Sequence, residues 1–209
     1  MELDGGVAVR VAALCLDANG RLSERLICSA AVRAGLLVDL ALAGRLESTD
    51  DSIVIDPTPT GFAPADRVLA AVAVEPERSL DGWLDERRIG LRDVADANVR
   101  SGRWESRRGL LPPGRRYLDR QPETTEHDRR LRGDTPLEEW SPADAAVAGI
   151  ALAAGLVAVP ADPATVQMLL SRTGAARWLC EAVAEHLAAV RARNSWTAAV
   201  LGAGGGGPF

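Results

Sequence analysis

One arginine, Arg33, interrupts the most apolar run of this chain, residues 29–43. A helix formed by such a run is buried on nearly every side. Burying a lone guanidinium costs several kcal/mol unless it pairs with an acid or reaches water. We therefore expect Arg33 either to meet a carboxylate, such as that of Asp39, or to open onto the surface at a site that needs a fixed positive charge.

Three further arginines, Arg87, Arg88 and Arg92, follow Trp83 along the chain. Residues four positions apart share one face of a helix, so Arg88 and Arg92 would point the same way in a continuous helix. Guanidinium groups form bidentate hydrogen bonds to phosphate oxygens, and a phosphorylated head group needs two or three of them. We predict an anion site made of Arg33, Arg88 and Arg92. In the alternative interpretation, these arginines pair with neighbouring acids on the surface.

The chain offers little for catalysis, metal binding or cofactor binding. All 24 basic residues are arginine, which excludes a lysine-containing phosphate loop and Schiff-base chemistry. Neither His127 nor His186 has a second His or a Cys at metal-ligand spacing, and no GxSxG or HExxH motif is present. We predict no catalytic residue, no metal site and no cofactor, hence no enzyme. Cys15, Cys28 and Cys180 are predicted to be core thiols of a reducing compartment.

Charge is unevenly distributed along the sequence. The net charge is −5, yet residues 100–132 hold ten arginines against five acids. A basic segment on an acidic body attracts anionic lipid or nucleic acid. The same composition is also typical of a solvated, arginine-rich loop, and the sequence leaves both interpretations open.

Apolar patterning and capping residues predict a mainly α-helical chain that positions these groups. Gly44 ends the apolar helix as a C′ residue, and Ser141 with Pro142 begins another helix as N-cap and N1. The charged, poorly periodic stretch 121–137 is predicted to be a loop. The predicted apolar and helical elements are residues 7–16, 26–43, 65–74, 80–89, 91–100, 141–157, 164–171 and 175–200, the last interrupted near Asn194.

Two short hairpins are predicted, each directly after a helix. The segments Gly44–Ser48 (GRLES) and Gly102–Ser106 (GRWES) are identical at four of five positions and lie 58 residues apart. The first hairpin covers residues 46–56, with its turn at 50–52. The second has a return strand that starts near Leu110 and Leu111 and stops at 112–114. We therefore expect a helix followed by a hairpin, twice.

This order of segments resembles the Golgi phosphoprotein 3 family from about Val9 to about Trp196. The most specific part is AGLLVDLALAGRLE, a short acidic turn, IVIDPTPTG, and then a helix with Trp83. The resemblance implies one helical domain that acts as a peripheral membrane protein. It also implies a ligand, because eukaryotic members of the family bind phosphatidylinositol 4-phosphate.

The resemblance carries some site residues over and departs at others. The head-group arginine of the family corresponds to Arg33. Two later basic residues of the family fall at Arg88 and Leu91, with Arg92 one step away. A family tryptophan is replaced by Glu24, whose carboxylate would repel a phosphate.

Relatives also insert a hydrophobic hairpin into the bilayer, and the matching segment here is residues 104–117. Its apolar tip consists of Leu110 and Leu111. The cations that flank this tip are Arg107, Arg108, Arg115 and Arg116. An apolar tip ringed by cations suits the interface of an anionic membrane. In the alternative, the two leucines pack against the body of the protein.

These observations predict one domain, residues 1–201, followed by a flexible glycine-rich tail, 202–209. The predicted function is a non-enzymatic peripheral membrane protein that binds anionic lipid head groups, among them phosphatidylinositol 4-phosphate. An acidic N-terminus and apolar runs too short to span a bilayer indicate a cytoplasmic protein at the inner face of the cytoplasmic membrane. The Arg- and Ala-rich composition indicates a bacterial member.

Two alternatives belong to other classes of function. A helix followed by a hairpin resembles a winged-helix arrangement, so the chain could be a nucleic-acid-binding regulator. Against this, the first helix before a hairpin is too apolar to face a groove, and nucleic acid is the less favoured partner. The other alternative is a scaffold that binds a second protein.

Overall fold

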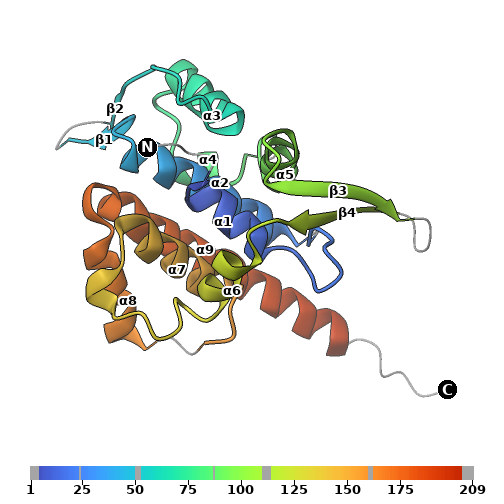
Figure 1. Ribbon diagram of the computed structural model, residues 1–209. Helices are drawn as coiled ribbons and strands as arrows, with labels where there is room; N and C mark the ends of the chain where they lie inside the picture. The colour runs from blue at the N-terminus through green and yellow to red at the C-terminus, as the bar shows by residue number, and fades with distance from the viewer. Residues whose placement is uncertain are drawn as a thin grey trace.

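The protein is a bundle of helices from which one hairpin projects (Figure 1). The computed structural model describes residues 5–23, 25–49, 53–86, 88–109, 114–159 and 162–203, with side chains as far as residue 193. Its α-helices are α1 (Val7–Leu14), α2 (Leu26–Leu42), α3 (Ala63–Val74), α4 (Leu80–Leu84), α5 (Leu91–Arg100), α6 (Pro122–Arg129), α7 (Pro142–Ala154), α8 (Pro163–Arg172) and α9 (Arg177–Ala203). Its strands are β1 (Leu46–Ser48), β2 (Ile53–Ile55), β3 (Trp104–Gly109) and β4 (Gly114–Asp119). The predicted fold class, mainly α with two small hairpins, is confirmed.

Helix α2 is the centre of the core, as its apolar sequence predicts. It packs against α1, α3, α5, α7 and α9, and almost every residue from Ile27 to Ala41 is buried. Gly35 allows α1 to approach closely, because a Cβ at this position would lie 2.7 Å from the Cα of Ala8. Gly44 ends the helix with φ at +67°, the left-handed conformation that a C′ glycine adopts.

Asp39 of α2 caps the N-terminus of α1. Its carboxylate accepts hydrogen bonds from the N–H groups of Val7 and Ala8, at 2.7 Å and 2.9 Å. These are two of the N–H groups that a helix leaves without an internal partner. Burial raises the pKa of Asp39 to about 7, although both N–H donors act in the opposite direction. The Asp39 carboxylate therefore caps α1, and the expected pairing of Asp39 with Arg33 does not occur.

The predicted loop over residues 121–137 is wrong, because α6 forms within it. Asp128 of α6 is buried and binds Arg10 of α1 through both oxygens, at 2.9 Å and 2.5 Å. Asp144 of α7 also binds Arg10, at 2.8 Å, and Arg132 lies 3.3 Å from Asp144. A helix this polar has no apolar period to reveal it, and it is stabilised by an ion cluster that involves distant residues.

Helices α7 and α9 form most of the C-terminal part of the chain. Ser141 caps α7 as predicted, accepting from the Asp144 N–H at 3.2 Å, while Asp144 accepts from the Ser141 N–H at 2.9 Å. The predicted break near Asn194 is wrong, since α9 is continuous from Arg177 to Ala203. A single asparagine among alanines costs a helix only about 0.7 kcal/mol. Helix α9 also extends into the predicted tail, whose residues 204–209 lie outside the described ranges.

A helix followed by a hairpin occurs twice, as the repeated sequence predicts. Gly44 and Gly102 both have positive φ values, +67° and +76°, and each separates a helix from a strand. In the second hairpin Gly109 pairs with Gly114, so the strand that returns along β3 is β4, whereas the strand predicted to start near Leu110 falls on residues outside the described ranges. Residues 50–52 and 110–113 lie outside the described ranges.

The predicted helix 80–89 is shorter than expected, because α4 ends at Leu84. Ser79 caps it by accepting from the Gly82 N–H at 3.2 Å. Beyond it, the carbonyl oxygens of Leu84 and Ile89 face the side chain of Arg33 instead of continuing the helix. The chain thus bends around Arg33, and this bend brings the first turn of α5 against α2.

Candidate functional site

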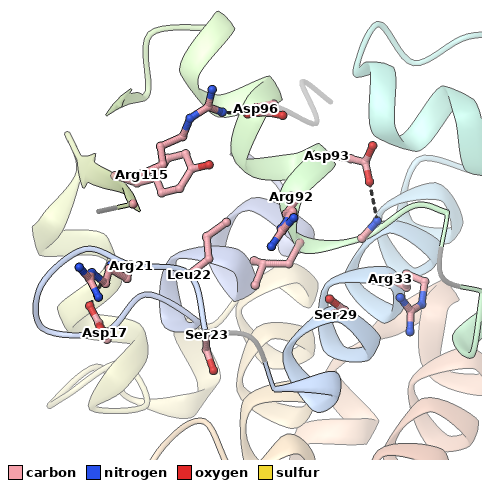
Figure 2. A pocket seen from close by; sticks show the side chains of 14 residues that line it. Asp17, Arg21, Leu22, Ser23, Ser29, Arg33, Arg92, Asp93, Asp96 and Arg115 are labelled. Carbon is pink, nitrogen blue, oxygen red and sulfur yellow. Dashed lines mark hydrogen bonds and ion pairs between the residues drawn. The ribbon is translucent and has the colours of Figure 1, made fainter. Parts of the chain in front are cut away.

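An open cleft of about 1160 Å³ lies between loop 17–23, α2, the first turn of α5 and β4 (Figure 2). We name it the arginine cleft, after the four arginines that line it: Arg21, Arg33, Arg92 and Arg115. The other lining residues are Asp17, Leu22, Ser23, Ser29, Gly90, Leu91, Asp93, Asp96, Gly114 and Tyr117. Residues from three regions of the sequence, 17–33, 90–96 and 114–117, therefore build one site.

Arg33 is held in this cleft by backbone carbonyl groups. Its Nε–H donates to the Leu84 oxygen at 2.6 Å, and Nη1 donates to the Ile89 oxygen at 3.4 Å. The residue is only 8% exposed, and it reaches the surface as part of the cleft wall. Carbonyl oxygens satisfy the N–H donors but carry no net charge, so these hydrogen bonds do not cancel the charge of the guanidinium.

Gly90 brings the chain close to that guanidinium. A Cβ at Gly90 would lie 3.3 Å from Nη1 of Arg33 and 3.5 Å from the Cβ of Ser29. The Gly90 N–H donates to Asp93 at 2.9 Å, at the point where α5 begins. The missing side chain therefore lets the first turn of α5 lie directly against Arg33.

Arg92 is the second predicted head-group residue in the cleft. It belongs to the first turn of α5, and Figure 2 shows it between Arg33 on one side and Arg21 and Arg115 on the other. The N-terminal end of a helix carries a partial positive charge and favours acids over cations. A cation in this turn therefore gains nothing from the dipole of its own helix.

Arg88 is not among the residues that line the cleft. Its N–H donates to Glu86 at 3.0 Å, and its carbonyl oxygen accepts from Arg67 at 3.2 Å. Of the predicted set, Arg33 and Arg92 therefore lie in the same cleft, and Arg88 does not. Glu24 and Arg87, which the sequence also singled out, lie outside the described residues.

Loop 17–23 supplies Arg21, which the sequence did not single out. Asp17 accepts from the N–H groups of Asn19 and Arg21, each at 2.8 Å, and the Arg21 N–H lowers the pKa of Asp17. Gly20 has φ at +73°, and its carbonyl oxygen accepts from the Tyr117 N–H at 2.6 Å. The Asp-Ala-Asn-Gly sequence predicts this turn, but only the contact with β4 places Arg21 at the cleft.

The second hairpin carries four arginines, all predicted to contact a membrane. They form two directly opposed pairs, Arg107 with Arg116 and Arg108 with Arg115. Like charges opposite one another destabilise a pair of strands. The hairpin projects from the helical body (Figure 1), so this basic end is presented to the surroundings. An anionic partner would relieve the repulsion between its strands.

Arg115 links this hairpin to the cleft. It donates to Asp96 of α5 at 2.7 Å, and it lines the cleft together with Tyr117. The first half of β4, which follows the hairpin turn, is thus one wall of the cleft. The predicted apolar tip, Leu110 and Leu111, lies outside the described residues, so its packing against the body or away from it stays a prediction.

This arrangement is suited to an anion with several oxygen atoms. Planar guanidinium groups bind phosphate in a bidentate manner, and the N-terminus of α5 adds the positive end of a helix dipole. The cleft also contains three acids: Asp93 accepts from Arg67, Asp96 accepts from Arg115, and Asp17 accepts from two backbone N–H groups. Within the described ranges, no group of three or more His, Cys, Asp and Glu side chains could hold a metal ion.

Two comparisons bear on the identity of the chain. A search of curated proteins gives no match. The sequence model of the Golgi phosphoprotein 3 (GPP34) family matches residues 10–199, which is most of the chain. No helix in the described part of the chain is both long and apolar enough to span a bilayer. With nearly its whole length matched, the chain belongs to the Golgi phosphoprotein 3 (GPP34) family.

Proposed function

We propose that this protein is a non-enzymatic peripheral membrane protein that binds anionic lipid head groups in the arginine cleft. One observation carries the proposal: Arg33 and Arg92, from two different helices, line one open cleft that strand β4 of the basic hairpin also lines. Converging guanidinium groups are what a phosphorylated head group requires. Phosphatidylinositol 4-phosphate is the first lipid to test, because it is the ligand that the family resemblance implies.

The position of the hairpin supports binding at a membrane rather than in solution. Since Gly114, Arg115 and Tyr117 of β4 line the cleft, a membrane that contacts the hairpin also lies near the cleft. Each arginine near an anionic surface contributes about 1 kcal/mol. The hairpin would attract the surface, and the cleft would select a head group from it. We place this activity at the inner face of the cytoplasmic membrane.

Vesicle flotation with the full-length protein tests the proposal. Four vesicle types are compared: phosphatidylcholine alone, and phosphatidylcholine with phosphatidylinositol, with phosphatidylglycerol, or with phosphatidylinositol 4-phosphate. We expect no flotation with phosphatidylcholine alone, flotation with anionic vesicles, and weaker flotation as salt increases. If the protein floats with none of the three anionic mixtures at low salt, lipid binding is excluded as its function.

A nucleic-acid-binding regulator is the second candidate, because α5 followed by β3 and β4 is arranged like a helix and a wing. The exposed face of α5 contains Arg92, Asp96 and Arg100. The acid in the middle of this face would oppose a phosphate backbone. Fluorescence anisotropy with a labelled DNA duplex separates the two candidates. Binding to DNA without binding to anionic vesicles would replace the lipid proposal.

A further inference from the structure

Two cysteines lie at the two ends of the segment that forms one wall of the arginine cleft. Cys15 ends α1 as its C-cap residue, and Cys28 belongs to the first turn of α2. Both are buried, and the Cys15 sulfur lies 4.0 Å from the carbonyl oxygen of Cys28. The chain between them contains the cleft residues Asp17 and Arg21. The two thiols are therefore neighbours in space, and they enclose a functional loop.

Cys28 has the surroundings of a reactive thiolate. Hydrogen bonding to the Cys15 thiol lowers the pKa of Cys28 to about 6, and Ser23 and Arg25 act in the same direction. The Arg25 guanidinium lies 3.9 Å from the Cys28 sulfur. A position near a helix N-terminus, beside an arginine, is where thiolates are stabilised in proteins. These neighbours favour the thiolate form of Cys28 over that of Cys15.

The other two cysteines differ from Cys28. Hydrogen bonding to Cys28, followed by burial, raises the pKa of Cys15 well above its ordinary value, so Cys15 keeps its proton. Burial raises the pKa of Cys180 to about 12, which makes it an inert thiol. Cys28 is therefore the thiol that favours the thiolate form, and Cys15 is the neighbouring thiol that can react with Cys28 after Cys28 is oxidised. Cys180 serves as an internal control.

We propose that Cys15 and Cys28 form an oxidant-sensitive pair that a hydroperoxide converts into a disulfide. The Cys28 thiolate attacks one peroxide oxygen, so an S–O bond forms and the O–O bond breaks. The departing oxygen takes a proton and leaves as an alcohol, or as water when the oxidant is hydrogen peroxide. Cys15 then attacks the Cys28 sulfur, forming the S–S bond and expelling hydroxide, which leaves as water with the proton of Cys15.

Cys28 is fully buried, so a small oxidant reaches its sulfur only when neighbouring side chains move. Two of the side chains that contact its sulfur lie toward the surface: Ser23 is half-buried and Arg25 is exposed. Movement of the loop end that carries these two residues is the route that we propose for the oxidant. Oxidation also removes the negative charge that Arg25 contacts, so the end of the loop loses one of its attachments. Sulfenic acid formation at a low-pKa thiolate beside a second thiol is established chemistry for redox-sensing cysteines.

A disulfide here would restrain the loop that carries Arg21. This loop is already held at its middle, where Gly20 accepts from Tyr117. A covalent bond between its ends would fix both sides of the same cleft wall. An effect on head-group binding rests on the function proposed above, whereas the oxidation of the pair does not depend on it.

The experiment treats the reduced full-length protein with a small excess of hydrogen peroxide at pH 7, blocks remaining thiols with N-ethylmaleimide, and maps peptides after trypsin. We expect the peptide Val11–Arg21 joined to Leu26–Arg33, while Trp178–Arg191 keeps Cys180 as its maleimide adduct. The Cys15→Ser variant should instead form a dimedone adduct at Cys28. The Cys28→Ser variant should leave Cys15 unoxidised, and Cys180→Ser should behave as wild type.

Absence of the joined peptide, together with equal oxidation of Cys28 and Cys180, would overturn the proposal. Native alkylation of the wild-type protein gives a second test that needs no substitution. Cys28 should react with iodoacetamide at least tenfold faster than Cys180. Equal rates would contradict the assignment of Cys28 as the reactive thiolate. Flotation of oxidised and reduced protein is measured separately. If neither form floats, the lipid function fails, while the joined peptide still reports on the pair.

Discussion

The Nε–H of Arg33 donates to the carbonyl oxygen of Leu84 across 2.6 Å and joins the central helix to the end of α4. The same side chain lines the arginine cleft. Arg33 is therefore part of the fold as well as part of the candidate site. A substitution of Arg33 is expected to change stability and binding together. We therefore test stability at Arg33 and lipid binding at other residues.

Replacement of Arg33 by methionine should destabilise the protein. Methionine fills a similar length but cannot donate, so the carbonyl groups of Leu84 and Ile89 lose this donor. Hydrogen bonds from a charged donor contribute about 1.5–3 kcal/mol, and we expect a loss of this size in the free energy of unfolding, measured by urea denaturation. Arg177→Ala, which removes an exposed ion pair with Glu181, is the control and should cost less than about 0.5 kcal/mol.

Arg92→Ala should weaken lipid binding without weakening the fold. Arg92 lies in the first turn of α5, where the helix dipole opposes a cation, so its removal should not destabilise the helix. The loss of one charged contact to a head group, about 1.4 kcal/mol, is a tenfold loss of affinity. Titration with anionic vesicles measures it, with Arg177→Ala again as the control. Unchanged affinity of Arg92→Ala would remove this arginine from the site.

Arg108→Glu should strengthen the hairpin and weaken membrane attraction. Arg108 lies directly opposite Arg115, so the change replaces repulsion across the strands by an ion pair worth about 0.2–1 kcal/mol. The same change removes a cation from the basic end and adds an acid. Thermal unfolding and vesicle flotation should therefore move in opposite directions. If both stability and flotation fall, the arginine serves the fold rather than the membrane.

The double substitution Leu110→Asp with Leu111→Asp should abolish vesicle binding and leave the fold intact. Two leucines inserted into the interface contribute roughly 3 kcal/mol, which corresponds to about a hundredfold in affinity. Flotation and circular dichroism of the same preparation provide the measurement. Loss of the folded signal would assign both leucines to the core, and full flotation by a folded variant would exclude the tip as the membrane contact.

Asp39 predicts a dependence of stability on pH. Burial raises its pKa from an ordinary 3.8 to about 7. Between these values the native state holds a proton that the unfolded state has lost. The free energy of unfolding contributed by this group therefore falls as pH rises from about 4 to about 7, with a slope of at most about 1.4 kcal/mol per pH unit.

Urea denaturation at several pH values, on the wild type and on Asp39→Asn, isolates this effect. The asparagine does not titrate, so its cost to the cap of α1 is the same at every pH. The stability advantage of the wild type over the variant should shrink between pH 4 and pH 7 and then stay constant. An advantage that is flat across this range would contradict the raised pKa.

The sequence predicts those elements whose signals are local. Helix α5 matches its predicted bounds, Gly44 ends α2, and Ser141 begins α7, because a capping group or an apolar period acts within a few residues. The repeated GRLES and GRWES segments correctly predict two helix-then-hairpin units. Arg33 is visible without a structure because it is an unusual charge in an apolar run, and Arg92 because it lies four positions after Arg88.

The sequence fails where distant contacts decide the outcome. Helix α6 is stabilised by the contact between Asp128 and Arg10, and nothing in the sequence around either residue indicates that the two will meet. Arg21 and Arg115 enter the cleft because Gly20 meets Tyr117 and because β4 has one particular register. Tertiary contacts of this kind override local propensity. They account for half of the arginines in the cleft.

The ion pair between Arg10 and Asp128 joins residues 118 positions apart, and this distance matters while the chain is being made. A ribosome adds about 5–20 residues each second, so Asp128 is synthesised roughly 6–24 s after Arg10. During that interval α1 and α2 exist without α7 and α9, which cover them in the finished protein. A nascent chain that stalls before α7 therefore presents the most apolar helix of the molecule to solvent and to chaperones.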